Sequence, residues 1–175
     1  MFEIGELIIY GGEGVCRVES IGAPAVSGAD KSRLYYTLAP LYRAGKVFAP
    51  VDTPVFMRHV IGRREAVELI RSIPSAEVEV YENRNLRFLS EHYQKSLQTH
   101  ECMDLVKLIK AVHLKRKNAE QNGKKLGQID EKYMKHAENI LYGELSVALD
   151  VPRESITDYL RSAIQKVEAG EEWDG

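Results

Sequence analysis

The chain has 175 residues, of which 44% are hydrophobic and 29% are charged, a composition typical of a folded, soluble globular protein. The formal net charge of −2 at pH 7 argues against a protein that coats nucleic acid through bulk positive charge. No apolar run approaches the roughly 18 residues that cross a bilayer. The N-terminal residues MFEIGE lack the basic start and apolar core of a signal peptide, so we expect a cytoplasmic protein.

The first 61 residues have the pattern of a small β module. Apolar runs over residues 7–10 and 15–18 flank Gly11, Gly12 and Gly14, which predicts a strand, a tight turn and a second strand. The elements predicted after this hairpin are the loop 22–31 and the strands 33–39, 46–51 and 55–61. Several short strands with Gly and Pro turns predict a small, strongly bent antiparallel sheet or barrel. Such a fold usually binds a partner and seldom catalyses.

From Gly62 onward, apolar residues recur at helical spacing. The predicted helices are 62–74, 84–97 and 103–121, a helix with Asp130 as its N-cap, and a last helix after Pro152. Within the second of these, Leu86, Leu89 and Tyr93 are expected on one face. Residues 75–82 alternate like a strand but lie where a linker is expected, and both interpretations stay open. A β module followed by helices predicts an α+β fold.

No catalytic or metal-binding grouping can be assembled from the sequence. Cys16 and Cys102 are too few and too far apart for a disulfide framework or a zinc site, and the five histidines fall at no metal-ligand spacing. The glycine-rich residues 11–14 are followed by a strand instead of the helix that would hold a phosphate. We therefore expect a protein that is not an enzyme and that carries no cofactor and no metal.

The segment from residue 107 to residue 125 is strongly basic. It has seven basic residues against one acidic residue, Glu120, which gives a local net charge of +6. The basic residues are Lys107, Lys110, Lys115, Arg116, Lys117, Lys124 and Lys125. A lysine-rich helix face is commonly a solvated surface, but these charges repel one another and have one local partner. Contact with DNA phosphates would explain the imbalance, and it would give a salt-dependent affinity with little sequence preference.

Four segments together resemble a known family. They are FEIGELIIYGGEGVCRV, YYTLAPLYRAGKVFAPVD, LVKLIKAVHLKRK and AENILYGELSVAL. Their order, over about residues 1–165, resembles the CarD-like bacterial transcription regulators, and the first part is also similar to the RNA polymerase-interacting domain of the transcription-repair coupling factor. The resemblance implies a Tudor-like β domain that docks on the polymerase β subunit. It also implies a helical domain beside promoter DNA near the transcription bubble, and no enzymatic activity.

The expected organisation follows from this resemblance and from the pattern of elements. It is a polymerase-interacting β domain over residues 1–61, a linking helix and linker over 62–82, a helical DNA-proximal domain over 83–169 and a flexible tail over 170–175. The only tryptophan, Trp173, falls in this tail, where we expect it to be exposed.

Well-known members of the family insert a tryptophan into the DNA minor groove, but this chain has no tryptophan before residue 173. Aligning Ser90 to Tyr93 with the family's wedge helix places Leu89 at the tryptophan position, whereas an alignment through the preceding linker favours Tyr81. Leu89 also has the helical spacing of a core residue, so the wedge and the core interpretations are both kept.

The resemblance also suggests which residues meet the partners. For the polymerase we expect Val26, Arg33 and Phe48, with docking through an exposed strand edge, and such an edge would also permit a homodimer. The residues expected at DNA are Arg84, Arg87, Lys110, Arg116, Lys124 and Lys125. The alternative is an adaptor that docks through the β module while its helical part recruits another protein and never touches DNA.

Overall fold

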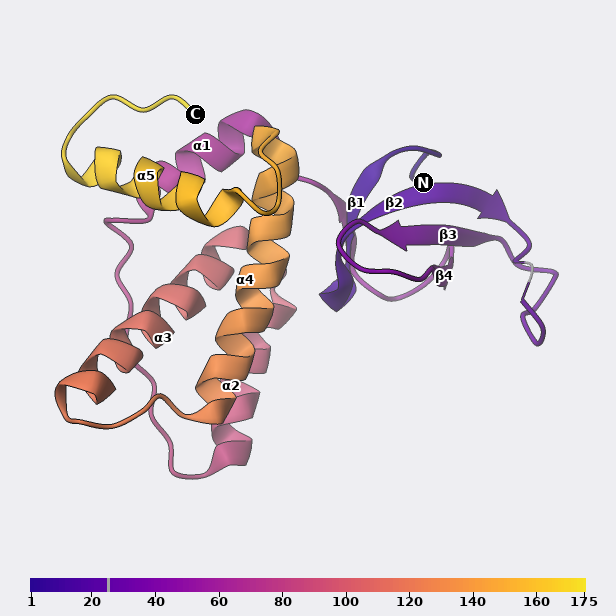
Figure 1. Ribbon diagram of the computed structural model, residues 1–175. Coiled ribbons are helices and arrows are strands. Elements are labelled where there is room, and N and C mark those ends of the chain that lie inside the picture. The colour runs from indigo at the N-terminus through magenta and orange to yellow at the C-terminus, as the bar shows by residue number, and fades with distance from the viewer. Residues whose placement is uncertain (25) are drawn as a thin grey trace. The chain divides into compact units, whose positions relative to one another are not determined.

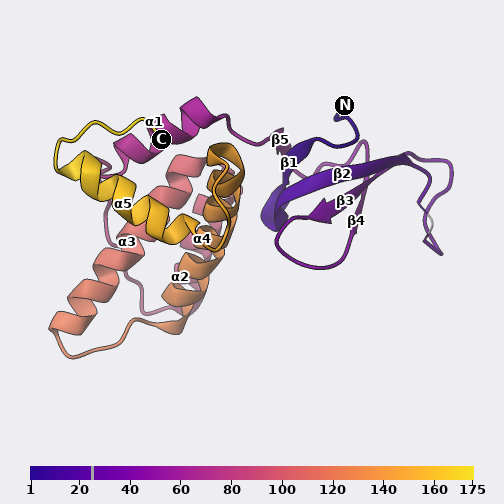
Figure 2. The ribbon, with the colours of Figure 1, turned by 45° about the horizontal axis from the view of Figure 1, so that its top comes forward.

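The computed structural model describes residues 1–24 and 26–175, so the loop expected over residues 22–31 is described except at Ala25. The chain divides into two compact units, Met1–Ile61 and Gly62–Gly175. We call them the β unit and the helical unit, and Figures 1 and 2 show their elements. A five-stranded antiparallel sheet followed by five helices confirms the predicted α+β class.

The β unit is one antiparallel sheet with the strand order β4-β3-β2-β1-β5. Its strands are β1 (Leu7–Tyr10), β2 (Gly14–Gly22), β3 (Tyr35–Pro40), β4 (Val47–Pro50) and β5 (Met57–His59). β4 and β5 are therefore the two edge strands. The register of β2 against β3 shifts between Val18 and Ser20, and such a bulge increases the local bend of a sheet.

Glycines make the first hairpin possible. A short 3-10 turn over Gly11–Glu13 joins β1 to β2, and Gly11 and Gly14 have φ angles of +45° and +76°. A side chain at Gly11 would also bring its Cβ to 2.9 Å from Cγ1 of Val55. The turn therefore needs glycine for its backbone angle and for the close approach of Val55.

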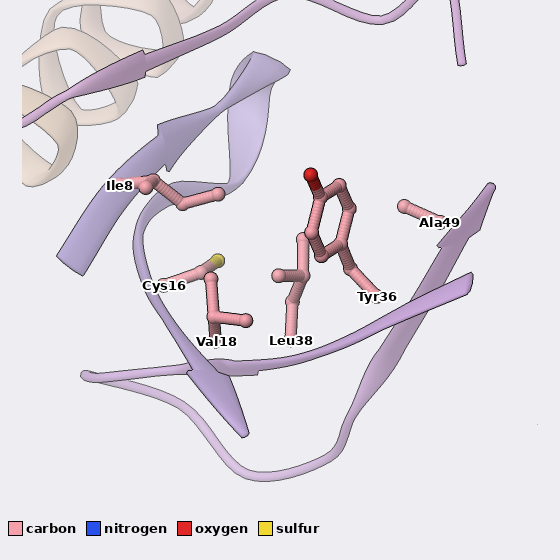
Figure 3. Close-up of a cluster of buried hydrophobic side chains, with 6 residues drawn as sticks. All are labelled: Ile8, Cys16, Val18, Tyr36, Leu38 and Ala49. Atoms are coloured by element: carbon pink, nitrogen blue, oxygen red, sulfur yellow. The ribbon is translucent and has the colours of Figure 1, made fainter. Parts of the chain in front are cut away.

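The core of the β unit is a cluster of side chains from four strands, shown in Figure 3. The buried members are Ile8, Cys16, Val18, Tyr36, Leu38 and Ala49. The Tyr36 hydroxyl accepts a hydrogen bond of 3.1 Å from the Phe2 N–H, which fixes the N-terminal segment over this cluster. The alternation of buried and half-buried residues along β3 is that of a sheet with one covered face.

The helical unit contains five helices. They are α1 (Arg63–Ser72), α2 (Leu86–Gln98), α3 (Cys102–Gln121), α4 (Gln128–Leu149) and α5 (Ile156–Glu168). α2 and α3 pack on α4 and on each other, while α1 packs on α4 and α5. Residues 75–82, which the sequence left open between strand and linker, form no strand or helix.

The prediction that Asp130 caps α4 is wrong. α4 begins two residues earlier, at Gln128, and Gly127 is its N-cap. Asp130 is instead a buried residue of the first turn, 3% exposed, where its carboxylate pairs with the Lys115 ammonium at 2.9 Å and accepts a hydrogen bond from the Tyr93 hydroxyl. A carboxylate is also favoured in a first helical turn, because that end of the helix dipole is positive.

The expectation of an exposed Trp173 is also wrong. The side chain is half-buried, and its ring meets that of Tyr159 edge-on at a centroid distance of 6.2 Å. The Arg71 guanidinium donates hydrogen bonds of 3.0 and 2.7 Å to the Trp173 carbonyl and pairs with the Asp174 carboxylate. These contacts join the last residues to α1 and α5.

Candidate functional site

The β4 edge of the sheet carries two of the three residues expected at the polymerase. Phe48 lies in β4 opposite Thr37 of β3, and 40% of Phe48 is exposed. Arg33 comes just before β3, and its guanidinium pairs with the Asp52 carboxylate just after β4 at 2.5 Å. This ion pair lies two residues beyond the last paired residues of the two strands, Tyr35 and Pro50, and between them the Val51 N–H donates a 2.9 Å hydrogen bond to the Leu34 carbonyl.

Val26 lies away from this pairing, in the loop between β2 and β3, and is 41% exposed. Two other apolar side chains of the β unit, which the sequence pattern did not single out, have a larger exposed fraction than Val26. Leu34 and Tyr42 are 54% and 45% exposed. Leu34 was assigned to a strand, but β3 begins one residue later at Tyr35.

Five exposed basic residues lie at one end of the helical unit. The start of α2, the last turns of α3, the loop 122–127 and the start of α4 lie at the lower end of this unit in Figure 1, and Figure 2 shows the same arrangement. The ion pair between Lys115 of α3 and Asp130 of α4 joins two of these segments. We call this region the basic end. Its exposed basic residues are Arg84, Arg87, Lys117, Lys124 and Lys125.

These exposed residues differ in how they are paired. The Arg87 guanidinium pairs with Glu91, one helical turn along α2, at 2.9 Å. Within the described residues, Arg84, Lys117, Lys124 and Lys125 have no carboxylate within ion-pair distance. They are therefore the cations at this end that can meet phosphate without breaking an ion pair.

Lys110 does not belong to a DNA-facing surface, so this expectation is corrected. It is half-buried, and its ammonium donates hydrogen bonds of 2.8, 3.0 and 2.7 Å to the carbonyls of Ile73, Pro74 and Ala76. An ammonium has three donors, and these three bonds use all of them. Lys110 therefore fastens the segment after α1 to α3.

Two further members of the basic run are turned toward α4. Lys115 is 15% exposed and pairs with Asp130, and it also donates a 3.1 Å hydrogen bond to the Tyr81 carbonyl. Arg116 is 32% exposed and lies 4.0 Å from the Glu131 carboxylate. Burial and the hydrogen bond to Asp130 raise the pKa of the Tyr93 hydroxyl, so Tyr93 stays protonated and donates to that carboxylate at neutral pH.

Neither residue proposed as a wedge is free to enter a groove. Leu89 is 4% exposed and belongs to the core. Tyr81 is half-buried, and its ring stacks on the His92 ring with centroids 3.8 Å apart and an interplanar angle of 9°. Burial is the main cause that lowers the pKa of His92, with Lys95 and Lys115 acting in the same direction, so this stack is one of neutral rings at pH 7.

The exposed apolar residues of α2 are Leu86 and Phe88, with 60% and 51% of their surface exposed. Leu86 was expected on the buried face with Leu89, but it lies in the first turn of the helix, where the neighbouring helices do not cover it. Phe88 precedes the buried Leu89 by one residue, which turns it about 100° away around the helix. A large aromatic residue outside the apolar stripe is the signal that could have identified it.

In the described parts of the chain, no three His, Cys, Asp or Glu side chains come close enough to share a metal ion. None of the helices in residues 1–24 and 26–175 combines the length and the apolar character needed to span a bilayer.

Comparison with known proteins gives one result for the β unit. The family model described as the CarD-like/TRCF RID domain matches residues 2–61 and ends just before Gly62, the N-cap of α1. No curated protein sequence matches the chain. Domains of this family are non-enzymatic and interact with RNA polymerase, so the match supports interaction of the β unit with the polymerase β subunit. The chain therefore carries a CarD-like RNA polymerase-interacting domain over residues 2–61.

Proposed function

We propose that this protein is a non-enzymatic bacterial transcription regulator. Its β unit binds the RNA polymerase β subunit, and the basic end of its helical unit contacts promoter DNA near the transcription bubble and alters the lifetime of the open complex. The observation that carries the DNA part is the grouping of unpaired cations with two exposed apolar side chains, Leu86 and Phe88, at one end of the helical unit. The protein would then lie at the nucleoid through the polymerase.

The charge distribution favours DNA contact that depends on the polymerase. Arg84, Lys117, Lys124 and Lys125 offer four phosphate contacts, too few for tight binding by a chain with a net charge of −2. Docking of the β unit on the polymerase makes the DNA contact intramolecular. With a short linker, the effective concentration of the basic end at the DNA is then of order mM. The contact is then strong enough to matter and remains sensitive to salt.

Phe88 replaces Leu89 and Tyr81 as the proposed apolar wedge. Proteins that open or bend DNA insert Phe, Leu, Ile or Met between base steps from the minor groove. Phe88 is an exposed aromatic side chain of α2, one residue after Arg87, and Arg84 lies just before the helix. Arg84 can hold a flanking phosphate while the ring enters the groove, whereas Arg87 would first have to leave Glu91.

Charge reversal tests the DNA contact. The double variant Lys124→Glu, Lys125→Glu should weaken the effect of the protein on polymerase–promoter complexes, because each lost phosphate contact lowers the salt-dependent affinity. The matched control is Lys95→Glu, Lys166→Glu, which reverses two exposed lysines of α2 and α5 outside the basic end. Equal activity of both double variants would remove the basic end from the proposal.

The adaptor alternative has one structural observation in its favour. Lys110, Lys115 and Arg116 are engaged inside the helical unit, so the surface is less basic than the sequence suggests. An adaptor would bind polymerase normally, and its effect would not depend on Lys124 and Lys125. The charge-reversal experiment therefore separates the two functions.

A further inference from the structure

Residues 170–175 form a strap across two helices of the helical unit. Gly170, with a φ of +72°, follows the end of α5, and residues 171–175 belong to no helix or strand. In Figures 1 and 2 this segment, drawn in yellow, runs from the end of α5 to the side of α1. We call residues 170–175 the strap. Because the strap belongs to no regular structure, its attachment depends on individual contacts with α1 and α5.

One set of contacts joins the strap to Arg71 of α1 and Tyr159 of α5. The Arg71 guanidinium donates hydrogen bonds of 3.0 and 2.7 Å to the Trp173 carbonyl, and it also pairs with the Asp174 carboxylate. The Trp173 ring meets the Tyr159 ring edge-on. The helices therefore offer the strap a cation for a carbonyl and a carboxylate, and an aromatic ring for its own ring.

A second contact is apolar. The backbone at Gly175 lies so close to α1 that a Cβ there would be 2.7 Å from Cγ2 of Val67. With the strap in place, Val67 is 7% exposed. Release of the strap would therefore uncover one continuous set of groups, namely the Val67 methyls, the Arg71 guanidinium and the Tyr159 ring.

These contacts are of the kind that opens readily. The pair between Arg71 and Asp174 lies in water, with 45% and 74% of the two side chains exposed, and exposed ion pairs contribute little to stability. The Trp173 ring is half-buried. Holding the strap in one conformation costs backbone and side-chain entropy, which these few contacts must offset. We therefore expect the strap to exchange between a closed and an open form.

We propose that the surface under the strap binds an acidic segment of a partner protein that carries an aromatic residue, and that the strap covers this surface until such a segment displaces it. The strap has the sequence Gly-Glu-Glu-Trp-Asp-Gly, and its carbonyl, ring and carboxylate contacts show which chemistry the surface accepts. The proposal does not rest on the DNA contact of the basic end, which lies elsewhere on the helical unit.

DNA fits this surface less well than an acidic peptide does. Of the three arginines in α1, Arg63 donates a 3.0 Å hydrogen bond to the Leu149 carbonyl, and Arg64 pairs with the Glu68 carboxylate at 3.1 Å. Only Arg71 of these three would meet a phosphate once the strap is open. A single phosphate contact gives little affinity for DNA.

Trp173 is the only tryptophan of the chain, so its fluorescence reports the strap directly. In the full-length protein, Arg71→Gln should release the strap, which shifts the emission to longer wavelength and increases quenching by acrylamide. The matched control is Arg64→Gln, because Arg64 is an exposed arginine of the same helix that pairs with Glu68. Circular dichroism checks that both variants keep their helices. Equal emission and quenching in the wild type and in both variants would overturn the proposal.

The probe for the partner site is a fluorescein-labelled peptide with the sequence of residues 169–175. It is titrated into the wild type and into the full-length variant Trp173→Ala, Asp174→Ala, in which the strap is weakened, and binding is followed by anisotropy. If the wild-type strap is closed about 90% of the time, the variant should bind the peptide roughly tenfold tighter, because only the open form can bind it. Adding Arg71→Gln to the variant should abolish binding, whereas adding Arg64→Gln should not.

Other occupants of the surface give different results. The same peptide with glutamine and asparagine in place of its acidic residues should bind more weakly, and a short DNA duplex should not increase the quenching of Trp173. The proposal would be overturned if the variant failed to bind the peptide, if it bound no more tightly than the wild type, or if DNA released the strap as well as the peptide does. Protection of Trp173 that rose with protein concentration would also overturn it, since the strap would then bind a second copy of the chain.

Discussion

The ion pair between Lys115 and Asp130 is almost wholly shielded from water. Only 15% of the Lys115 side chain and 5% of the Asp130 side chain are exposed. Removing one partner of such a pair leaves an uncompensated charge in a medium of low polarity. This pair and the Tyr93 hydroxyl join α2, α3 and α4 at the basic end.

Asp130→Asn should lower the free energy of unfolding by about 3 kcal/mol, because the Lys115 ammonium loses its carboxylate. Urea denaturation followed by circular dichroism measures this loss. The control is Glu68→Gln, which breaks the exposed pair with Arg64 and should cost less than about 1 kcal/mol. Adding Lys115→Met to Asp130→Asn should recover most of the stability. Similar losses of unfolding free energy in Asp130→Asn and Glu68→Gln would show that the Lys115–Asp130 pair contributes no more than an exposed pair, which would contradict this prediction.

Cys16 gives a pH-dependent prediction for the β unit. Burial, with a smaller contribution from Glu13, raises the pKa of its thiol to about 11 from an ordinary value of 9.0. Between these values the unfolded chain loses the proton while the folded chain keeps it. The free energy of unfolding should therefore fall as the pH rises from about 9 to 11. Cys16→Val removes the titrating group, and its stability should fall less over this interval. An equal fall of the free energy of unfolding in the wild type and in Cys16→Val would contradict this prediction.

The roles of individual polar residues could not be read from the sequence alone. Lys110 and Lys115 belong to the same basic run as Lys124, but the first two are bound by the segment 73–82 and by Asp130, which are far from them in the chain. Likewise, Asp130 has the residue type and position of an N-cap, and only the packing of α2 and α3 explains its burial. Contacts between residues far apart in the chain determine whether these side chains are buried or available to a partner.

At the scale of the elements, the sequence predicted most of the architecture. The first hairpin follows from the spacing of the glycines, and α1 and α3 begin and end within one or two residues of the boundaries that the apolar periodicity indicated. The spacing of apolar residues predicts helices well because one face of each helix is buried in the core. It failed at the start of α2, since a first turn can carry an apolar residue such as Leu86 that no neighbouring element covers.

The β4 edge is the element that we expect to dock on the polymerase. An edge strand has unpaired backbone groups that can pair with a strand of another protein, and Phe48 adds an exposed aromatic side chain there. Phe48→Asp should reduce capture of the polymerase β subunit roughly tenfold or more, as loss of an aromatic anchor does at other interfaces.

A variant near the other edge of the sheet serves as the control for Phe48→Asp. Val55 precedes β5 and has the same exposed fraction as Phe48, 40%, so Val55→Asp introduces the same charge at an equally exposed position. A pull-down with purified polymerase compares the two variants. Normal capture by Phe48→Asp, or equal loss in both variants, would place the docking surface elsewhere on the β unit.

At the scale of the whole molecule, the proposed function depends on having two attachments on one chain. The polymerase-interacting domain provides the first, and the basic end provides a second that is weak by itself. Because the phosphate contacts release counterions, the contribution of the second attachment should decline steeply with salt while the first is retained. Neither unit alone should reproduce the effect of the full chain on a promoter complex.

The lifetime of a bacterial polymerase–promoter open complex, measured with and without this protein across a salt series, tests this account most directly. We predict that the protein changes the lifetime at low salt and that the change shrinks steeply as salt rises, by the amount expected for about four phosphate contacts. The control double variant Lys95→Glu, Lys166→Glu should behave as the wild type. A protein that binds the polymerase but leaves the lifetime unchanged at every salt concentration would contradict the account.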